Sequence, residues 1–175
     1  MKKIVTTIFC ALMMSTSARS ATLDEREVNQ VKLEISSMYK AFEHGDANEI
    51  LDKTHESLYK LAGGKESLEK AMQQAAKRNM ALGNKFISFE IGTPTKTYLA
   101  DEEEVCFVSI VSVVESQGMQ VKSTGFMIAI RKRGTNEWRY IDGAGLKNNP
   151  DLLYSILFPK LERGIVLPPI SAELI

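Results

Sequence analysis

The sequence predicts an α+β fold in which helices come first and a curved antiparallel sheet of four to five strands follows. Two observations lead to this prediction. From residue 22 to about residue 82, apolar residues recur at steps of three and four, the period of amphipathic helices. From Phe86 onward the period falls to about two and β-branched residues become frequent, as in strands. Because the two kinds of element are segregated along the chain, the helices are expected to pack on one face of the sheet.

Three helices are expected in the first half of the chain. The pattern Thr22–Glu25 has the form of a capping box, and the first helix should run from there to His44–Gly45. A second helix is expected to begin at Asp46 and to continue until Gly63–Gly64 breaks the chain. The third is expected from Lys65 to about Leu82.

The strand region divides at turn residues. The predicted strands are Phe86–Ile91, Thr95–Ala100, Val105–Val114, Val121–Arg131 and Glu137–Asp142, with an acidic turn at Asp101–Glu104. Both alternating faces of Val105–Val114 are largely apolar, so this strand should be covered on both sides or lie at the centre of a curled sheet. Asn149–Pro150 is expected to start a short helix that ends near Leu157, and three later prolines should keep the rest of the chain extended.

The first twenty residues have the composition of a secretory signal peptide. Lys2 and Lys3 precede an apolar stretch, Ile4–Met14, which is too short to span a bilayer. Small residues around Ser20 predict cleavage after that position, so we expect a periplasmic or secreted protein that has no membrane segment after cleavage. The expected organisation is a signal peptide at 1–20, one domain at 21–145, and a tail at 146–175 packed on that domain.

Composition narrows the classes of function. The chain has 175 residues, 22 Lys+Arg and 22 Asp+Glu, which suits one domain with a real core. The balanced charge gives no electrostatic reason to expect nucleic acid as a partner. After signal removal Cys106 is the one cysteine left, so no internal disulfide is expected, and its position in an apolar strand predicts burial.

The order of elements resembles the nuclear-transport-factor-2-like superfamily, also called the cystatin-like α+β cone. The resemblance rests on the long opening helix, His44-Gly45-Asp46, the third helix, the paired strands and the closing Trp138–Asp142. It covers about Thr22 to Asp142 and implies a cone-shaped domain with a pocket. It selects no activity, because the superfamily includes isomerases, dehydratases, hydrolases, transport adaptors and immunity proteins. The tail after Asp142 and the long third helix depart from its small enzymes.

Known cofactor and metal motifs do not fit this chain. Gly64-Lys65-Glu66-Ser67 resembles a phosphate-binding loop only superficially, because Glu66 separates the lysine from the serine. His44 and His55 are eleven residues apart, which is not a metal-ligand spacing. We therefore expect no cofactor and no metal.

The candidate ligand-binding residues are His55, Tyr59 and Asp142. His55 and Tyr59 are four residues apart and would be neighbours on one helix face. A carboxyl group near a histidine and a phenol could transfer protons in an apolar pocket, where desolvation would raise the pKa of the acid. The alternative gives all three purely structural roles: a solvated histidine, a packed tyrosine and a turn-capping aspartate. No catalytic residue is assigned.

Three functions follow as hypotheses. The leading one is an exported, non-catalytic binding or interaction module that uses its pocket for a small apolar ligand, or its sheet face for a protein partner or a homodimer. The second is a small-molecule lyase, isomerase or hydrolase that works by general acid–base chemistry. The third is an immunity or inhibitor protein against a secreted toxin, which would carry its charge on a protruding loop such as Asp101–Glu104. An enzyme should bring at least two titratable side chains together in the pocket.

Overall fold

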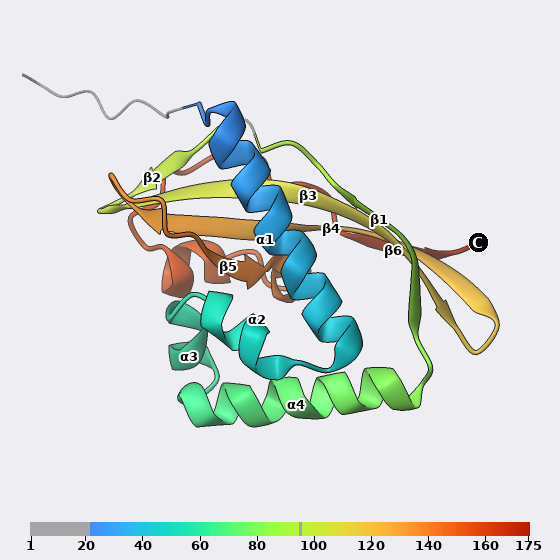
Figure 1. Cartoon of the computed structure of the whole chain (residues 1–175). Helices are drawn as coiled ribbons and strands as arrows, with labels where there is room; N and C mark the ends of the chain where they lie inside the picture. Colours follow the sequence, from blue (N-terminus) through green and yellow to red (C-terminus); the bar gives the residue numbers. More distant parts are fainter. Residues whose placement is uncertain (1–21, 95) are drawn as a thin grey trace, which may run out of the picture.

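The computed structural model describes residues 22–94 and 96–175, and it has the predicted α+β order (Figure 1). The predicted signal peptide and its cleavage site lie outside the described residues, as does Thr95 of the second predicted strand. Four helices come first: α1 (Glu25–His44), α2 (Ala47–Lys53), α3 (Ser57–Leu61) and α4 (Lys65–Ala81). In Figure 1, α1 lies in front of the sheet, and α4 lies at the same side of it as α2 and α3.

The sheet is antiparallel and has six strands, where the sequence predicted four to five. They are β1 (Lys85–Ile91), β2 (Tyr98–Ala100), β3 (Glu103–Ser116), β4 (Met119–Lys132), β5 (Arg139–Asp142) and β6 (Ser171–Leu174). The main order is β1-β3-β4-β5; β2 also pairs with β3, and β6 pairs with β4. The additional strand, β6, belongs to the tail that the sequence predicted only as extended chain.

The N-cap of the first helix lies two residues later than predicted. Asp24, rather than Thr22, is the N-cap: its carboxylate accepts a hydrogen bond from the backbone N–H of Glu27 at 2.8 Å. The Glu27 carboxylate accepts one in return from the backbone N–H of Asp24 at 2.8 Å. Asp24 and Glu27 thus form the reciprocal capping box. The predicted end is confirmed, because Gly45 adopts the left-handed conformation with φ of 78°.

The second predicted helix is two helices, which makes the prediction of one continuous helix wrong. Between α2 and α3 the chain is extended, and Thr54 forms a parallel bridge with Tyr140 of β5. The backbone N–H of His55 donates to the Tyr140 carbonyl at 3.0 Å, and the Thr54 hydroxyl donates to the Ile50 carbonyl at 2.8 Å. Pairing with the edge of the sheet thus replaces helical hydrogen bonds here. His55 and Tyr59 therefore do not share a helix face.

Each face of the sheet has its own apolar cover. On the helix side, α1 and α2 pack against residues of β3, β4 and β5 that include Cys106, Val108, Met127, Ala129 and Tyr140. On the other side, a tail that includes one π-helical turn, η2 (Leu153–Leu157), packs against the opposite face through Leu146, Leu153, Leu157, Phe158 and Leu161. Both faces of β3 are covered near Val105, as predicted, whereas Ser109 farther along the strand is exposed. Cys106 is fully buried, and burial raises the pKa of its thiol to about 12, so it acts as a small core residue.

Candidate functional site

An apolar pocket of about 460 Å³ lies between the helices and the sheet. This volume is within the range of small-molecule sites, roughly 300–1,000 Å³. All four helices, three strands and the 3-10 helix η1 (Gly143–Leu146), which follows β5, contribute to its wall. The residues that line it are Met38, Tyr39, Phe42, Ile50, Thr54, Leu58, Met72, Ala75, Phe86, Met127, Tyr140, Asp142, Ala144 and Gly145.

Aromatic rings form a large part of this wall. The Tyr39 ring of α1 lies 4.1 Å from the Phe89 ring and 5.8 Å from the Phe86 ring of β1, measured between centroids. The Tyr140 hydroxyl donates a hydrogen bond to the Glu34 carboxylate at 3.0 Å, which fixes this ring against α1. Burial raises the pKa of both phenols above the usual value, so both stay protonated over the ordinary pH range.

Asp142 is the one lining residue, among those the structure describes, that carries a formal charge. It ends β5 opposite Met127 of β4, so its side chain shares the pocket with the Met127 thioether. Desolvation by the surrounding atoms raises the pKa of the carboxyl group, partly offset by the Ala144 backbone N–H, which donates to Oδ1 at 2.8 Å. Asp142, Ala144 and Gly145 are exposed residues, so the carboxyl stands where the pocket opens to solvent.

The turn after Asp142 is held close to the sheet by a glycine. A Cβ atom built on Gly143 would lie 2.5 Å from the Phe126 ring, far inside the van der Waals distance. Only a residue without a side chain can therefore bring this backbone so near to β4. Close packing at Gly143 positions η1, and with it the Ala144 N–H, which donates to the Asp142 carboxylate that caps η1.

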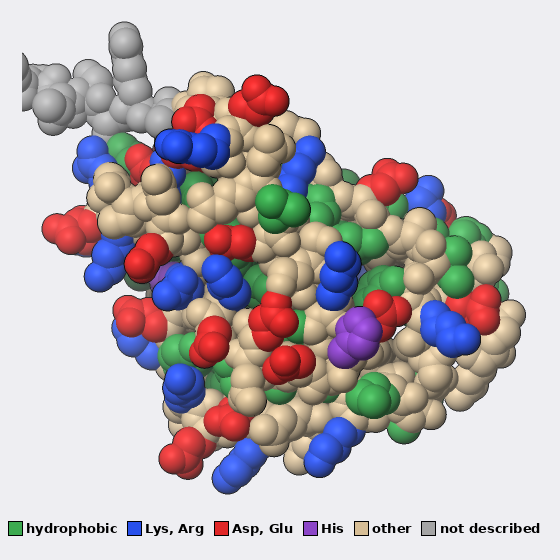
Figure 2. Space-filling view, in the orientation of Figure 1, with side chains coloured by type: hydrophobic (Ala, Val, Ile, Leu, Met, Phe, Trp, Pro, Cys, Tyr) green, Lys and Arg blue, Asp and Glu red, His purple; other side chains and the backbone are tan. Residues whose placement is uncertain are grey.

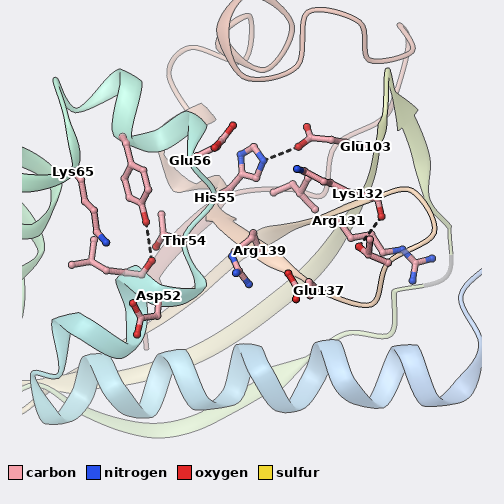
Figure 3. Close-up of a pocket in the computed structure, with 14 residues that line it drawn as sticks. Asp52, Thr54, His55, Glu56, Lys65, Glu103, Arg131, Lys132, Glu137 and Arg139 are labelled. Carbon is pink, nitrogen blue, oxygen red and sulfur yellow. Dashed lines mark hydrogen bonds and ion pairs between the residues drawn. The ribbon is translucent and has the colours of Figure 1, made fainter.

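A second pocket, of about 450 Å³, is polar and contains the other two candidate residues (Figure 3). Figure 3 shows His55 directed at Glu103 of β3, and Nε2 lies 3.0 Å from the Glu103 carboxylate. The Ser57 backbone N–H donates to Nδ1 at 3.3 Å, so Nδ1 is an acceptor and Nε2 carries the proton. The Tyr59 hydroxyl donates to the Leu51 carbonyl at 3.0 Å. Hydrogen bonds within the protein therefore fix the positions of both the His55 and the Tyr59 side chain.

The His55 contacts resemble a nucleophilic relay, but their geometry does not serve one. The Ser57 hydroxyl lies 2.8 Å from Nδ1, which completes a chain from serine through histidine to Glu103. Ser57 is buried, however, and it does not line the polar pocket, so a substrate there cannot reach its oxygen. The chain of hydrogen bonds instead fastens the extended segment 54–55 to the start of β3.

The three candidate residues lie on two different pockets. His55 and Tyr59 line the polar pocket, Asp142 lines the apolar pocket, and Thr54 lines both. The structure therefore does not bring the carboxyl of Asp142 together with the imidazole. Tyr39 and Tyr140, which sequence reasoning missed, are the phenols near Asp142. The apolar periodicity of the segments that contain them predicts that both side chains face inward. It does not distinguish a residue that lines a cavity from one that fills the core.

The acidic run Asp101–Glu104 is used largely within the molecule. Asp101 pairs with Lys160 of the tail at 2.6 Å, Glu103 contacts His55, and Glu104 accepts from Arg131 Nε at 2.7 Å. Glu103 and Glu104 belong to β3 rather than to a turn. On the molecular face that carries α1, cationic and acidic side chains are interspersed, and no single sign of charge dominates (Figure 2).

Residues 22–94 and 96–175 contain neither a metal-binding cluster nor a membrane-spanning helix. No cluster of three or more His, Cys, Asp or Glu is placed there to hold a metal ion. No helix in this part is both long and apolar enough to cross a bilayer. Comparison of the chain with protein-family models, with curated proteins and with solved structures gives no match.

Proposed function

We propose that this protein is an exported, non-catalytic binding module of the nuclear-transport-factor-2-like superfamily, which holds a small apolar molecule in the apolar pocket. The observation that carries the proposal is the pocket itself: a cavity of about 460 Å³ whose wall is made of aromatic rings, thioethers and aliphatic side chains. The superfamily assignment is supported by the order of helices and antiparallel strands, and by the position of the pocket between the two layers.

The energetics of such a pocket favour an apolar occupant. Apolar surface removed from water contributes roughly 25 cal/mol per Å². A ligand that buries about 200 Å² would therefore gain roughly 5 kcal/mol before the entropic costs of association. Met38, Met72 and Met127 line the wall, and flexible thioethers adapt their shape to the occupant.

A binding role fits the lining better than acid–base catalysis. Proton transfer at ordinary pH needs donor and acceptor groups whose pKa values lie near that pH. The pKa values of Tyr39 and Tyr140 are raised by burial, which leaves Asp142 as the one lining group, among the described residues, that can change its charge over the ordinary pH range. His55, the other candidate base, lines the polar pocket instead.

The interaction roles on the surface have less support. The tail packs on the sheet face that a homodimer would use, so such a dimer would have to incorporate or displace it. The acidic run that an inhibitor could present to a toxin pairs with Lys160, His55 and Arg131 of the same chain.

Titration of the purified protein with the neutral fluorescent dye Nile red tests the proposal. Met72→Trp should fill the pocket and weaken dye binding by about tenfold or more, because the indole occupies space that the ligand needs. Met80→Trp is the matched control: Met80 lies on the same helix but is exposed and does not line the pocket. Failure of the wild-type protein to bind the dye, or equal affinity of the Met72→Trp and wild-type proteins, would refute the proposal.

A further inference from the structure

We infer that the molecule held in the apolar pocket is an amphiphilic amine, whose ammonium group pairs with the Asp142 carboxylate while its hydrocarbon part lies among the rings and thioethers. The inference rests on the proposed function and names the ligand class for the same site. Among the described residues that line the pocket, the only formal charge is that of Asp142.

The Asp142 carboxylate has unused hydrogen-bonding capacity. Its Oδ1 accepts from the Ala144 N–H, whereas Oδ2 accepts no hydrogen bond from any described residue. The ion pairs found in residues 22–94 and 96–175 do not include Asp142. A carboxylate in such a setting lacks a counter-ion, and an ammonium group can donate up to three hydrogen bonds to it.

The neighbouring rings favour the same sign of charge. Tyr39, Phe42, Phe86 and Tyr140 line the pocket together with Asp142, and the π-faces of aromatic rings attract cations. The negative charge of Asp142 is close enough to Tyr39 to contribute to the raised pKa of its phenol. An ammonium group placed near Asp142 would meet both the carboxylate and a ring, whereas a carboxylate ligand would be repelled.

The desolvation of Asp142 also favours a cationic ligand. Desolvation by the atoms around it disfavours the charged carboxylate, and the pKa of Asp142 is raised accordingly, although the residue stands at the mouth of the pocket. A bound ammonium restores a favourable partner for the anion, so amine binding should strengthen as the pH rises and Asp142 ionises. A neutral alcohol of the same length should show no such dependence.

Competition against Nile red with one hydrocarbon chain and three headgroups tests the inference. Decylamine, decanol and decanoate, each kept below the concentration at which it self-associates, should bind the full-length protein in that order at pH 7.5. We expect decylamine to bind about tenfold or more tightly than decanol, because charge-assisted hydrogen bonds to the carboxylate add binding free energy of that size. Asp142→Asn should remove that preference, because an amide keeps the shape and loses the charge.

Asp52→Asn is the matched control, since it removes the same charge from an exposed residue of the polar pocket. It should leave the amine preference intact. If decanol competes with the dye, the proposed function stands. In that case equal affinities for decylamine and decanol, or an amine preference that survives Asp142→Asn, would overturn the inference about the ligand class only. If neither the dye nor any decyl compound binds, the proposed function fails, and the inference fails with it.

Discussion

The guanidinium group of Arg131 stacks on the indole of Trp138, with 4.6 Å between the Arg131 Cζ atom and the ring centroid. The same group donates to Glu104 of β3 and to Glu27 of α1, so one side chain ties the first helix to the sheet. Desolvation lowers the pKa of Arg131, but the hydrogen bonds and charges of the two carboxylates outweigh it, and the net shift is upward. Arg131 is only 9% exposed, so these contacts are shielded from water.

Replacing Arg131 should therefore destabilise the protein strongly. Arg131→Met would leave Glu27 and Glu104 close together without their cation, and removing one partner of a buried ion pair costs about 3–5 kcal/mol. Urea denaturation measures the free energy of unfolding. Lys132→Met, at the exposed neighbouring position, is the control and should stay within about 0.5 kcal/mol of wild type. A similar small change for Arg131→Met would contradict this account.

Gly143→Ala should destabilise the protein by about 1–3 kcal/mol, because its methyl group would collide with the Phe126 ring. Gly145→Ala tests the same substitution two residues later, where a Cβ atom meets nothing within 4 Å. Thermal or urea denaturation of the two variants should separate them clearly. Equal stabilities would mean that the turn shifts without cost.

Leu153→Ala should cost about 2–5 kcal/mol, as expected for a leucine truncated in a packed core. Leu153 belongs to the tail and is fully buried against the sheet, with 0% exposure. Ile156, in the same turn, is 47% exposed, so Ile156→Ala should cost less than about 1 kcal/mol. If both variants unfold at the same urea concentration as wild type, the tail contributes nothing to the folded domain.

The effect of replacing Asp142 on the free energy of unfolding should depend on pH. Its pKa is raised in the folded protein, so the folded state binds the proton more tightly than the unfolded chain does. Stability should therefore fall as the pH rises from about 4, the ordinary pKa of an aspartate, through the folded value. The penalty is fully present above that value. Asp142→Asn should be more stable than wild type at pH 8, with no such gain at pH 3.5, as measured by urea denaturation. A gain of the same size at both pH values would contradict ionisation as its cause.

The elements that the sequence predicted well depend on local patterns. The apolar stripe of α1, its end at Gly45 and the coverage of both faces of β3 near Val105 follow from periodicity and from one glycine. The break between α2 and α3 depends instead on a distant partner, because Thr54 and His55 leave the helix to pair with Tyr140. Local propensity contains no information about that contact.

The candidate site was less predictable for a related reason. The four-residue spacing of His55 and Tyr59 predicts neighbours on one helix face. His55 lies instead in extended chain, where successive side chains point to opposite faces. His55 therefore contacts Glu103 and Phe158, on the tail side of the sheet. The apolar pocket is space that the residues of four helices, three strands and η1 leave unfilled between the layers, and sequence periodicity does not reveal such a volume.

The cover on the tail side has a consequence for biosynthesis. Leu146, Leu153 and Leu161 leave the ribosome after every strand on which they pack, so the nascent chain presents Val105, Ile128 and Ile130 before their partners exist. We expect a chaperone to recognise this stretch of the unfinished polypeptide, because exposed β-branched surface is prone to aggregate. This face of the sheet is complete only once Leu146, Leu153 and Leu161 have packed on it.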